Sequence, residues 1–99
     1  MCTITILKDK NSNLIITMNR DEQKDRGLEI EPEKYVEENN IYAYPVDSKS
    51  SGSWIGCNSK SVVLCMLNLY QHSNLINQNP VSRGLITPEA MQHGRLEDV

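Results

Sequence analysis

The sequence predicts an α+β fold, in which an antiparallel sheet of two hairpins is accompanied by a helical layer. Three segments carry this prediction: two short apolar strands near the N-terminus, a Val- and Leu-rich pair of strands after residue 50, and a helix-start pattern after residue 82. The chain has 99 residues, which is enough for one small domain and excludes two separate cores.

The first hairpin is predicted from residues 3–8 (TITILK) and 14–18 (LIITM), with a polar turn between them. Successive side chains of a strand point to opposite faces, so the preferred register is the one that separates apolar from polar side chains best. That register pairs Thr3 with Asn19. Its apolar face consists of Cys2, Ile4, Ile6, Leu14, Ile16 and Met18. A shift by one residue is the alternative, and both registers bring Cys2 close to Arg20 and Asp21.

Residues 20–40 are dominated by charged side chains, as in a solvated loop or an exposed helix. Proline is favoured at the first position of a helix, so one short helix is expected to begin at Pro32 and to continue through the following EKYVEE.

The second hairpin is predicted from residues 51–68, with Asn58, Ser59 and Lys60 in the turn. Residues 61–70 (SVVLCMLNLY) are so rich in Val and Leu that this strand is expected to be buried on both faces. Trp54 and Asn68 then lie near the open ends of the hairpin, which point the same way. Trp54 either packs the hairpin against the core or lines a pocket.

The last predicted element is a helix within residues 82–94. Thr87 is expected to be its N-cap, Pro88 its first residue and Glu89 part of its first turn, and Gly94 is expected to end it.

Composition excludes several classes of protein. With 13 acidic and 10 basic residues the net charge is −3, which argues against a nucleic-acid-binding surface. Neither a signal-peptide pattern nor an apolar run of membrane-spanning length is present, so a cytoplasmic protein is expected. Three cysteines in such a chain indicate reduced thiols. The wide spacing of Cys57, Cys65, His72 and His93 does not match a zinc site, and neither a metal nor another cofactor is expected.

Cys2 is the strongest candidate for chemistry. Removal of Met1 would make it the N-terminal residue, and its α-amine could then take the thiol proton. A neighbouring guanidinium such as Arg20 would favour the thiolate, and Asp21 would hold the amine. The alternative is that Cys2 is a small buried hydrophobic residue at the start of a strand.

Five motifs occur in an order that resembles the NRDE family of transport-and-Golgi-organisation proteins. They are Met1-Cys2, the NRDE string at residues 19–22, Gly52-x-Trp54-x-Gly56-x-Asn58, Leu67-Asn68 and Ser82-Arg83-Gly84. The resemblance spans about residues 1–86. It implies a partial αββα sandwich of the N-terminal-nucleophile hydrolase type, in which residues 1–99 are the N-terminal part of the family domain. Ser61 departs from the pattern, because a glycine usually closes the turn after Asn58.

The resemblance also implies a function. The chain would be a cysteine amidohydrolase that cleaves a C–N amide bond, with catalytic residues Cys2, Arg20, Asp21 and Asn68. The implied substrate-binding residues are Asn19, Glu22, Trp54, Asn58 and Arg83. One alternative is a non-catalytic cytosolic protein that handles haem or takes part in trafficking, and another is an inactive remnant. The expected partner is accordingly a small-molecule amide or haem, and an exposed sheet edge would favour a homodimer.

Overall fold

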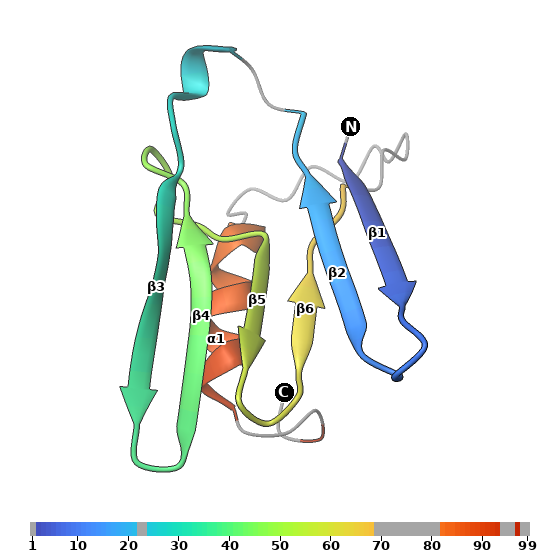
Figure 1. The fold of residues 1–99 in the computed structure, drawn as a ribbon. Helices are drawn as coiled ribbons and strands as arrows, with labels where there is room; N and C mark the ends of the chain where they lie inside the picture. Colours follow the sequence, from blue (N-terminus) through green and yellow to red (C-terminus); the bar gives the residue numbers. More distant parts are fainter. Residues whose placement is uncertain (1, 22–23, 69–81, 94–96, 98–99) are drawn as a thin grey trace.

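The computed structural model describes residues 2–21, 24–68, 82–93 and 97, and it confirms an α+β fold with two antiparallel sheets and one short helix (Figure 1). The first sheet contains two strands and the second contains four in the order β3-β4-β5-β6. The elements are β1 (Thr3–Lys8), β2 (Leu14–Asn19), the 3-10 turn η1 (Lys24–Arg26), β3 (Ile30–Glu37), β4 (Asn40–Val46), β5 (Ile55–Asn58), β6 (Val63–Cys65), the 3-10 turn η2 (Arg83–Leu85) and α1 (Ile86–Gln92).

The first hairpin has the predicted register, with Thr3 opposite Asn19. Asp9 organises its turn, because one carboxylate oxygen accepts the backbone N–H groups of Asn11 at 2.7 Å and Asn13 at 2.9 Å. The Asn13 side-chain amide donates to the other carboxylate oxygen at 3.0 Å, and this hydrogen bond, followed by the backbone ones, lowers the pKa of Asp9. The register therefore follows from both the face pattern and the turn chemistry.

The helix predicted after Pro32 is wrong, because β3 occupies residues 30–37 and pairs with β4. Tyr35 lies opposite Tyr42, and the rings of Tyr35, Tyr42 and Tyr44 stack with centroids 4.9–6.2 Å apart. Ring stacking across strands stabilises the hairpin. The charged side chains of this segment are largely exposed, as expected, but on a strand.

The second hairpin forms as predicted, although its strands are short. The side-chain oxygen of Asn58 accepts the N–H groups of Lys60 and Val62, both at 3.0 Å, and so closes the turn. Ser61 has a φ of 64°, in the left-handed region that favours glycine. A serine at this position is therefore strained.

Replacing Ser61 with glycine is expected to raise the free energy of unfolding by roughly 0.5–1 kcal/mol. The stability increases because glycine adopts the left-handed conformation without backbone strain. The increase is partly offset by the greater conformational entropy of glycine in the unfolded chain. Urea unfolding followed by circular dichroism measures it. Ser61→Ala removes the hydroxyl but keeps the strain, so equal stabilisation by alanine would contradict the explanation.

The helix α1 begins at Ile86, one residue before Thr87, and the predicted N-cap is wrong. The turn η2 precedes it, and the side chain of Ser82 caps that turn by accepting the N–H of Gly84 at 3.3 Å. Thr87 is instead fully buried inside the first helical turn. Its side-chain oxygen has no hydrogen-bond partner in the part of the chain that the structure describes. The helix ends at Gln92, and the predicted stop at Gly94 lies outside the described residues.

Thr87→Val is expected to raise the free energy of unfolding by about 1 kcal/mol, because it keeps the shape and removes a buried hydroxyl without a partner. Thermal unfolding measures the change. Thr17→Val, on the exposed side of β2, is the matched control and should leave stability nearly unchanged. A loss of stability in Thr87→Val would show that the hydroxyl is satisfied after all.

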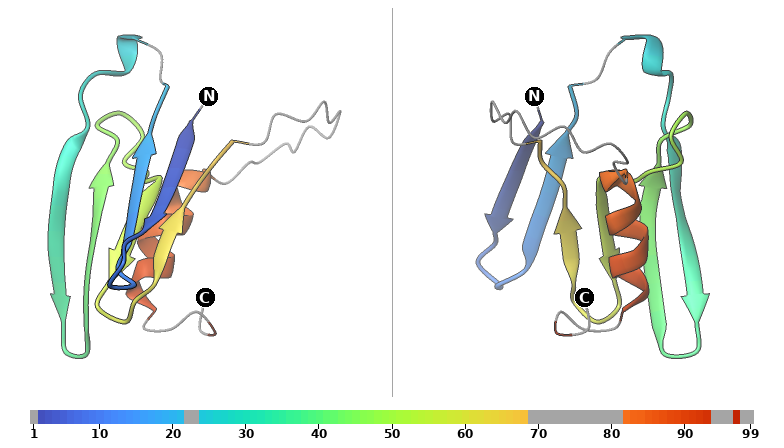
Figure 2. Two further views of the ribbon diagram at one scale, coloured as in Figure 1. Left: turned by 45° about the vertical axis from the view of Figure 1, so that its right-hand side comes forward. Right: turned by 180° about the vertical axis from the view of Figure 1, so that it is seen from behind.

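The elements form three layers, with the β1–β2 hairpin on one side of the four-stranded sheet and α1 on the other (Figure 2). The core lies between α1 and the sheet and contains Tyr42, Ala90 and Met91. Among the described residues, no helix combines the length and the apolar character needed to cross a membrane.

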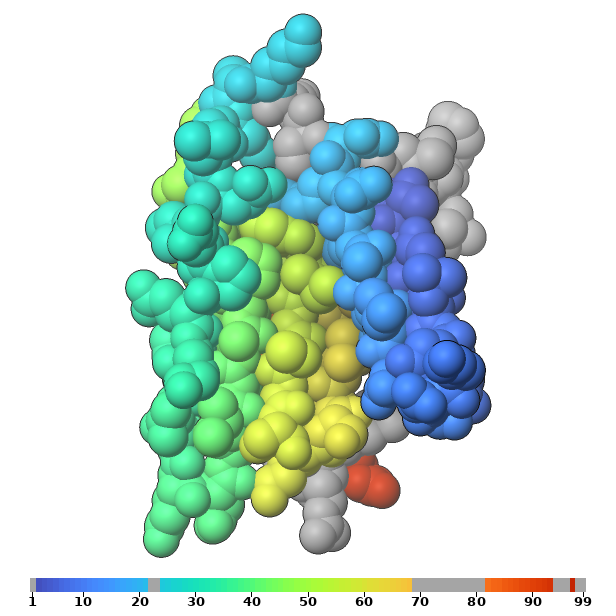
Figure 3. Space-filling view, in the orientation of Figure 1, coloured from blue at the N-terminus to red at the C-terminus, as the bar shows by residue number. Residues whose placement is uncertain are grey.

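The face of the four-stranded sheet that points away from α1 is only partly covered. Between β3 and β2 the atoms of β4, β5 and β6 are visible from outside (Figure 3). Residue Val63 on this face is 44% exposed, so β6 is not buried on both faces as predicted. Strand β6 also ends at Cys65, and residues 69 and 70 of the predicted strand lie outside the described residues.

Candidate functional site

A cavity of about 270 Å³ lies where one end of each sheet meets the other. Neighbouring strands are antiparallel, so the start of β1 and the end of β2 share an edge, as do the end of β4, the start of β5 and the end of β6. The residues directly beyond these strand ends line the cavity. They are Cys2, Arg20, Asp47, Trp54, Met66, Leu67 and Asn68, joined by Arg26, Ser50, Gly52, Ser53, Ser82, Arg83 and Gly84.

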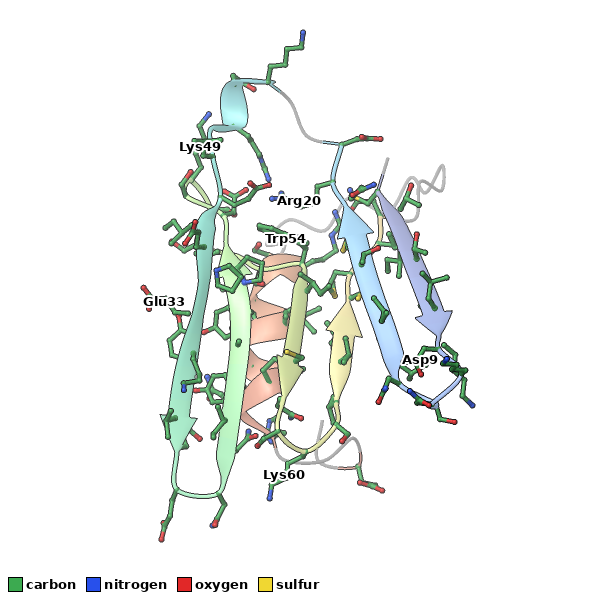
Figure 4. All side chains as sticks on the ribbon, in the orientation of Figure 1. Asp9, Arg20, Glu33, Lys49, Trp54 and Lys60 are labelled. Carbon is green, nitrogen blue, oxygen red and sulfur yellow. The ribbon has the colours of Figure 1, made fainter. Side chains whose placement is uncertain are left out.

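Arg20 lines the cavity with a side chain that is held from several directions. Its guanidinium carbon lies 3.6 Å from the centroid of the Trp54 ring. Figure 4 labels both side chains. One terminal nitrogen lies 3.4 Å from a carboxylate oxygen of Asp47, and the other lies 3.7 Å from Glu29. The side chain is only 9% exposed. Stacking and ion pairing together hold the cation in one orientation.

Asp47 is a buried carboxylate with four hydrogen bonds. Its Oδ1 atom accepts the backbone N–H groups of Lys49 and Ser50, both at 2.9 Å, and its Oδ2 atom faces Arg20 at 3.4 Å and Arg26 at 3.3 Å. The hydrogen bond from Ser50 is the largest cause that lowers its pKa to about 2, followed by those from Lys49 and the charge of Arg26, while burial opposes the shift. Asp47 therefore stays ionised, and its carboxylate links two arginines to the loop of residues 47–50.

A backbone contact between two glycines joins η2 to the loop that follows Asp47. A Cβ on Gly84 would lie 2.7 Å from the Cα of Gly52, which is closer than such atoms approach. The N–H of Ser53 also donates to the carbonyl of Gly84 at 2.8 Å. This close approach places the neighbouring Arg83 at the cavity.

The structure brings five predicted site residues together at the cavity and places the others elsewhere. The lining includes Cys2, Arg20, Trp54, Asn68 and Arg83. Asn19 is exposed at the end of β2, and Asp21, which follows Arg20 in the chain, is also exposed. Asn58 lies in the β5–β6 turn, where its side-chain N–H donates to the carbonyl of His93 at 3.0 Å. Glu22 lies outside the described residues.

Sequence reasoning missed Asp47 and Arg26, which complete the charged wall of the cavity. The segment 47–50 (DSKS) does carry a signal, because an aspartate before small polar residues often accepts the N–H two residues later. The pairing of Arg26 with Asp47 joins residues 21 positions apart and has no local signal.

The three cysteines are free thiols, as predicted from their number. Cys2 is half-buried at the cavity, while Cys57 is exposed on β5. Burial raises the pKa of the Cys65 thiol. The three thiols therefore differ in environment, which makes their reactivities separable.

The model of the family described as Transport and Golgi organisation 2 matches residues 1–98. The chain belongs to this family. Neither the curated proteins nor the solved structures yield a match. The resemblance predicted from the five motifs is confirmed, and the match extends beyond the region that carries them.

In this member of the Transport and Golgi organisation 2 family, the glycine-rich motif of residues 52–58 has a distinct physical role at each named position. Gly52 contacts Gly84, and Gly56 lies against α1, where a Cβ would come within 2.8 Å of the Met91 side chain. Trp54 stacks on Arg20, and Asn58 joins the turn to the end of α1. The motif thus fixes the cavity at one end of β5 and the helix along its length.

Proposed function

We propose that this chain is a cysteine amidohydrolase that acts on a small amide, with Cys2 as the nucleophile. The observation that supports this function best is the position of Cys2, a free thiol in the wall of a cavity that also contains Arg20 and Asn68. A nucleophile, a cation and an amide donor in one cavity are the groups that acyl transfer requires.

The proposed reaction begins after Met1 is removed, when the α-amine of Cys2 is free to act as its base. The amine takes the thiol proton, and the thiolate attacks the amide carbonyl carbon to form a tetrahedral oxyanion. The C–N bond then breaks, the amine product leaves with the proton, and a thioester remains on Cys2. Water hydrolyses the thioester, which releases a carboxylic acid and restores the thiol.

Three other residues support these steps in the proposal. The Asn68 side-chain amide donates to the oxyanion, and removal of such a donor typically lowers kcat by about 10²–10³-fold. Asp21 holds the α-amine of Cys2. The Arg20 guanidinium favours the thiolate, and its stacking on Trp54 and pairing with Asp47 keep it in place.

Alkylation of the thiols with iodoacetamide tests the activation of Cys2. Mass spectrometry of the purified protein first shows whether Met1 has been removed, and the labelling rate of each cysteine is then followed at neutral pH. We expect Cys2 to react at least about tenfold faster than the exposed Cys57, because a thiolate is the reactive species. Cys65 should react most slowly, since burial raises its pKa.

Turnover provides the second measurement. Hydrolysis of a set of small amides should be lost in Cys2→Ala and kept in Cys57→Ser, which removes a thiol on the open face of the sheet. Met1 retained in protein from its native host, or equal labelling of Cys2 and Cys57, would contradict the proposal. The cavity would then bind its ligand without turnover.

A further inference from the structure

The charged side chains that line the cavity are not balanced among themselves. Three arginines face one carboxylate, so the described lining carries two more positive than negative charges: Arg20, Arg26 and Arg83 against Asp47. This local excess contrasts with the net charge of −3 for the whole chain. A concave surface with an excess of one charge concentrates ligands of the opposite sign.

The three arginines differ in what surrounds them. Arg20 and Arg26 both contact Asp47, and Arg20 also pairs with Glu29 and stacks on Trp54. These contacts tie both arginines to the wall built by Asp47.

Arg83 reaches the cavity from η2 and contacts neither Asp47 nor Glu29. No acidic side chain among the described residues lies within ion-pair distance of it, although it lines the same cavity. Its backbone is fixed because Gly84 packs against Gly52 and accepts the N–H of Ser53. A guanidinium on a rigid segment, in a cavity that also contains Arg20 and Arg26, is placed to receive an anion from the solvent.

We propose that Arg83 is the anion-recognition residue of the cavity and that the substrate is a small amide carrying a carboxylate or a phosphate-like group. That the substrate is an amide rests on the proposed amidohydrolase function. That it carries an anionic group rests on the charges that line the cavity. The planar guanidinium forms two parallel hydrogen bonds with either oxyanion. A volume of about 270 Å³ fits a small metabolite, and a cationic amide would be repelled.

Three amides that differ in charge test whether binding depends on the anionic group or on the amide. N-methylsuccinamic acid carries a carboxylate, N-methyl-3-phosphonopropanamide carries a phosphonate, and N-methylbutanamide has a similar length without charge. Their affinities are measured by calorimetric titration on the full chain with Cys2→Ala, so that binding is observed without turnover. We expect at least one anionic probe to bind about tenfold or more tightly than the neutral probe.

The variants identify the residue responsible. Arg83→Gln in the same background should remove the preference for the anion, and added salt should weaken it in the parent protein. Lys60→Gln also removes one positive charge, but Lys60 lies in the β5–β6 turn at the other end of the sheet from Arg20 and Trp54 (Figure 4), so the preference should persist. Circular dichroism confirms that each variant is folded.

The outcomes distinguish the two proposals. A preference for the carboxylate or for the phosphonate supports the inference and names the group. Equal affinities for charged and neutral probes, or a preference that survives Arg83→Gln, would overturn it. A protein that binds the anionic probes but hydrolyses no amide refutes the proposed function alone, whereas hydrolysis of the neutral probe as fast as the anionic ones refutes the anion site alone.

Discussion

Replacing Gly84 with valine is expected to destabilise the protein by about 3 kcal/mol or more, which is enough to unfold many domains of this size. The added Cβ would meet the Cα of Gly52 at 2.7 Å and the backbone N of Ser53 at 3.3 Å. Backbone atoms in a hydrogen-bonded segment cannot move aside as a side chain can. The segments that carry Gly52 and Gly84 should separate at the cavity, and urea unfolding measures the loss of stability.

Gly56→Ala is the comparison that tests this reasoning. Its Cβ would meet two side chains of α1, Cγ of Met91 at 2.8 Å and Cγ2 of Thr87 at 2.9 Å, and of these methionine is flexible enough to yield in part. The expected cost is about 2 kcal/mol, below the cost of about 3 kcal/mol expected for Gly84→Ala, because no backbone atom lies in the way. If Gly84→Ala proves the cheaper of the two, the backbone contact does not hold the cavity together.

Removal of the Asp47 carboxylate is expected to have the second large effect. Asp47→Ala removes the acceptor that two backbone N–H groups and two guanidinium groups share, and should lower the free energy of unfolding by about 3 kcal/mol. Asp47→Asn keeps an oxygen for the N–H groups but not the charge, so it should cost about 2 kcal/mol. Asp25→Asn, an exposed carboxylate in η1, is the matched control and should change little.

The pH dependence of stability tests the same group independently. The folded-state pKa of Asp47 is about 2, below the ordinary value of 3.8, so its contribution is fully present above about pH 4. That contribution is lost as the pH falls from about 4 towards 2. Asp47→Asn should flatten the stability profile in this window, and an unchanged profile in the variant would assign acid unfolding to other carboxylates.

Much of the fold could be predicted where local patterns and chain geometry agree. The faces of the first hairpin are clearly different, so a one-residue slip would expose Ile4 and Met18, and the register was determined by that difference. The β5–β6 turn was marked by Asn58, whose side chain closes it.

The β3–β4 hairpin was missed because two local signals conflicted with its tertiary role. Pro32 and the glutamates after it favour a helix start, yet Tyr35 stacks on Tyr42 across the two strands, and this contact forms only once the hairpin has formed. Residues 40–46 contain Ile, two Tyr and Val, which favour the strand that the structure shows there.

The candidate site was predictable to the extent that strand ends could be placed. Cys2, Arg20, Trp54 and Asn68 each follow from the two hairpins, since their open ends meet at one edge. The Thr87 cap failed for a different reason: a buried packing position against Gly56 outweighed the preference of a hydroxyl for a helix end.

Trp54 is the only tryptophan of the chain, and it lies in the cavity wall beneath Arg20. The tyrosines that the structure describes stack on one another in β3 and β4 instead. Indole emission from this protein therefore originates at one known place. An occupant of the cavity that shifts the guanidinium or displaces water should alter the spectrum of the unlabelled chain, so ligands can be screened optically without any engineered fluorophore.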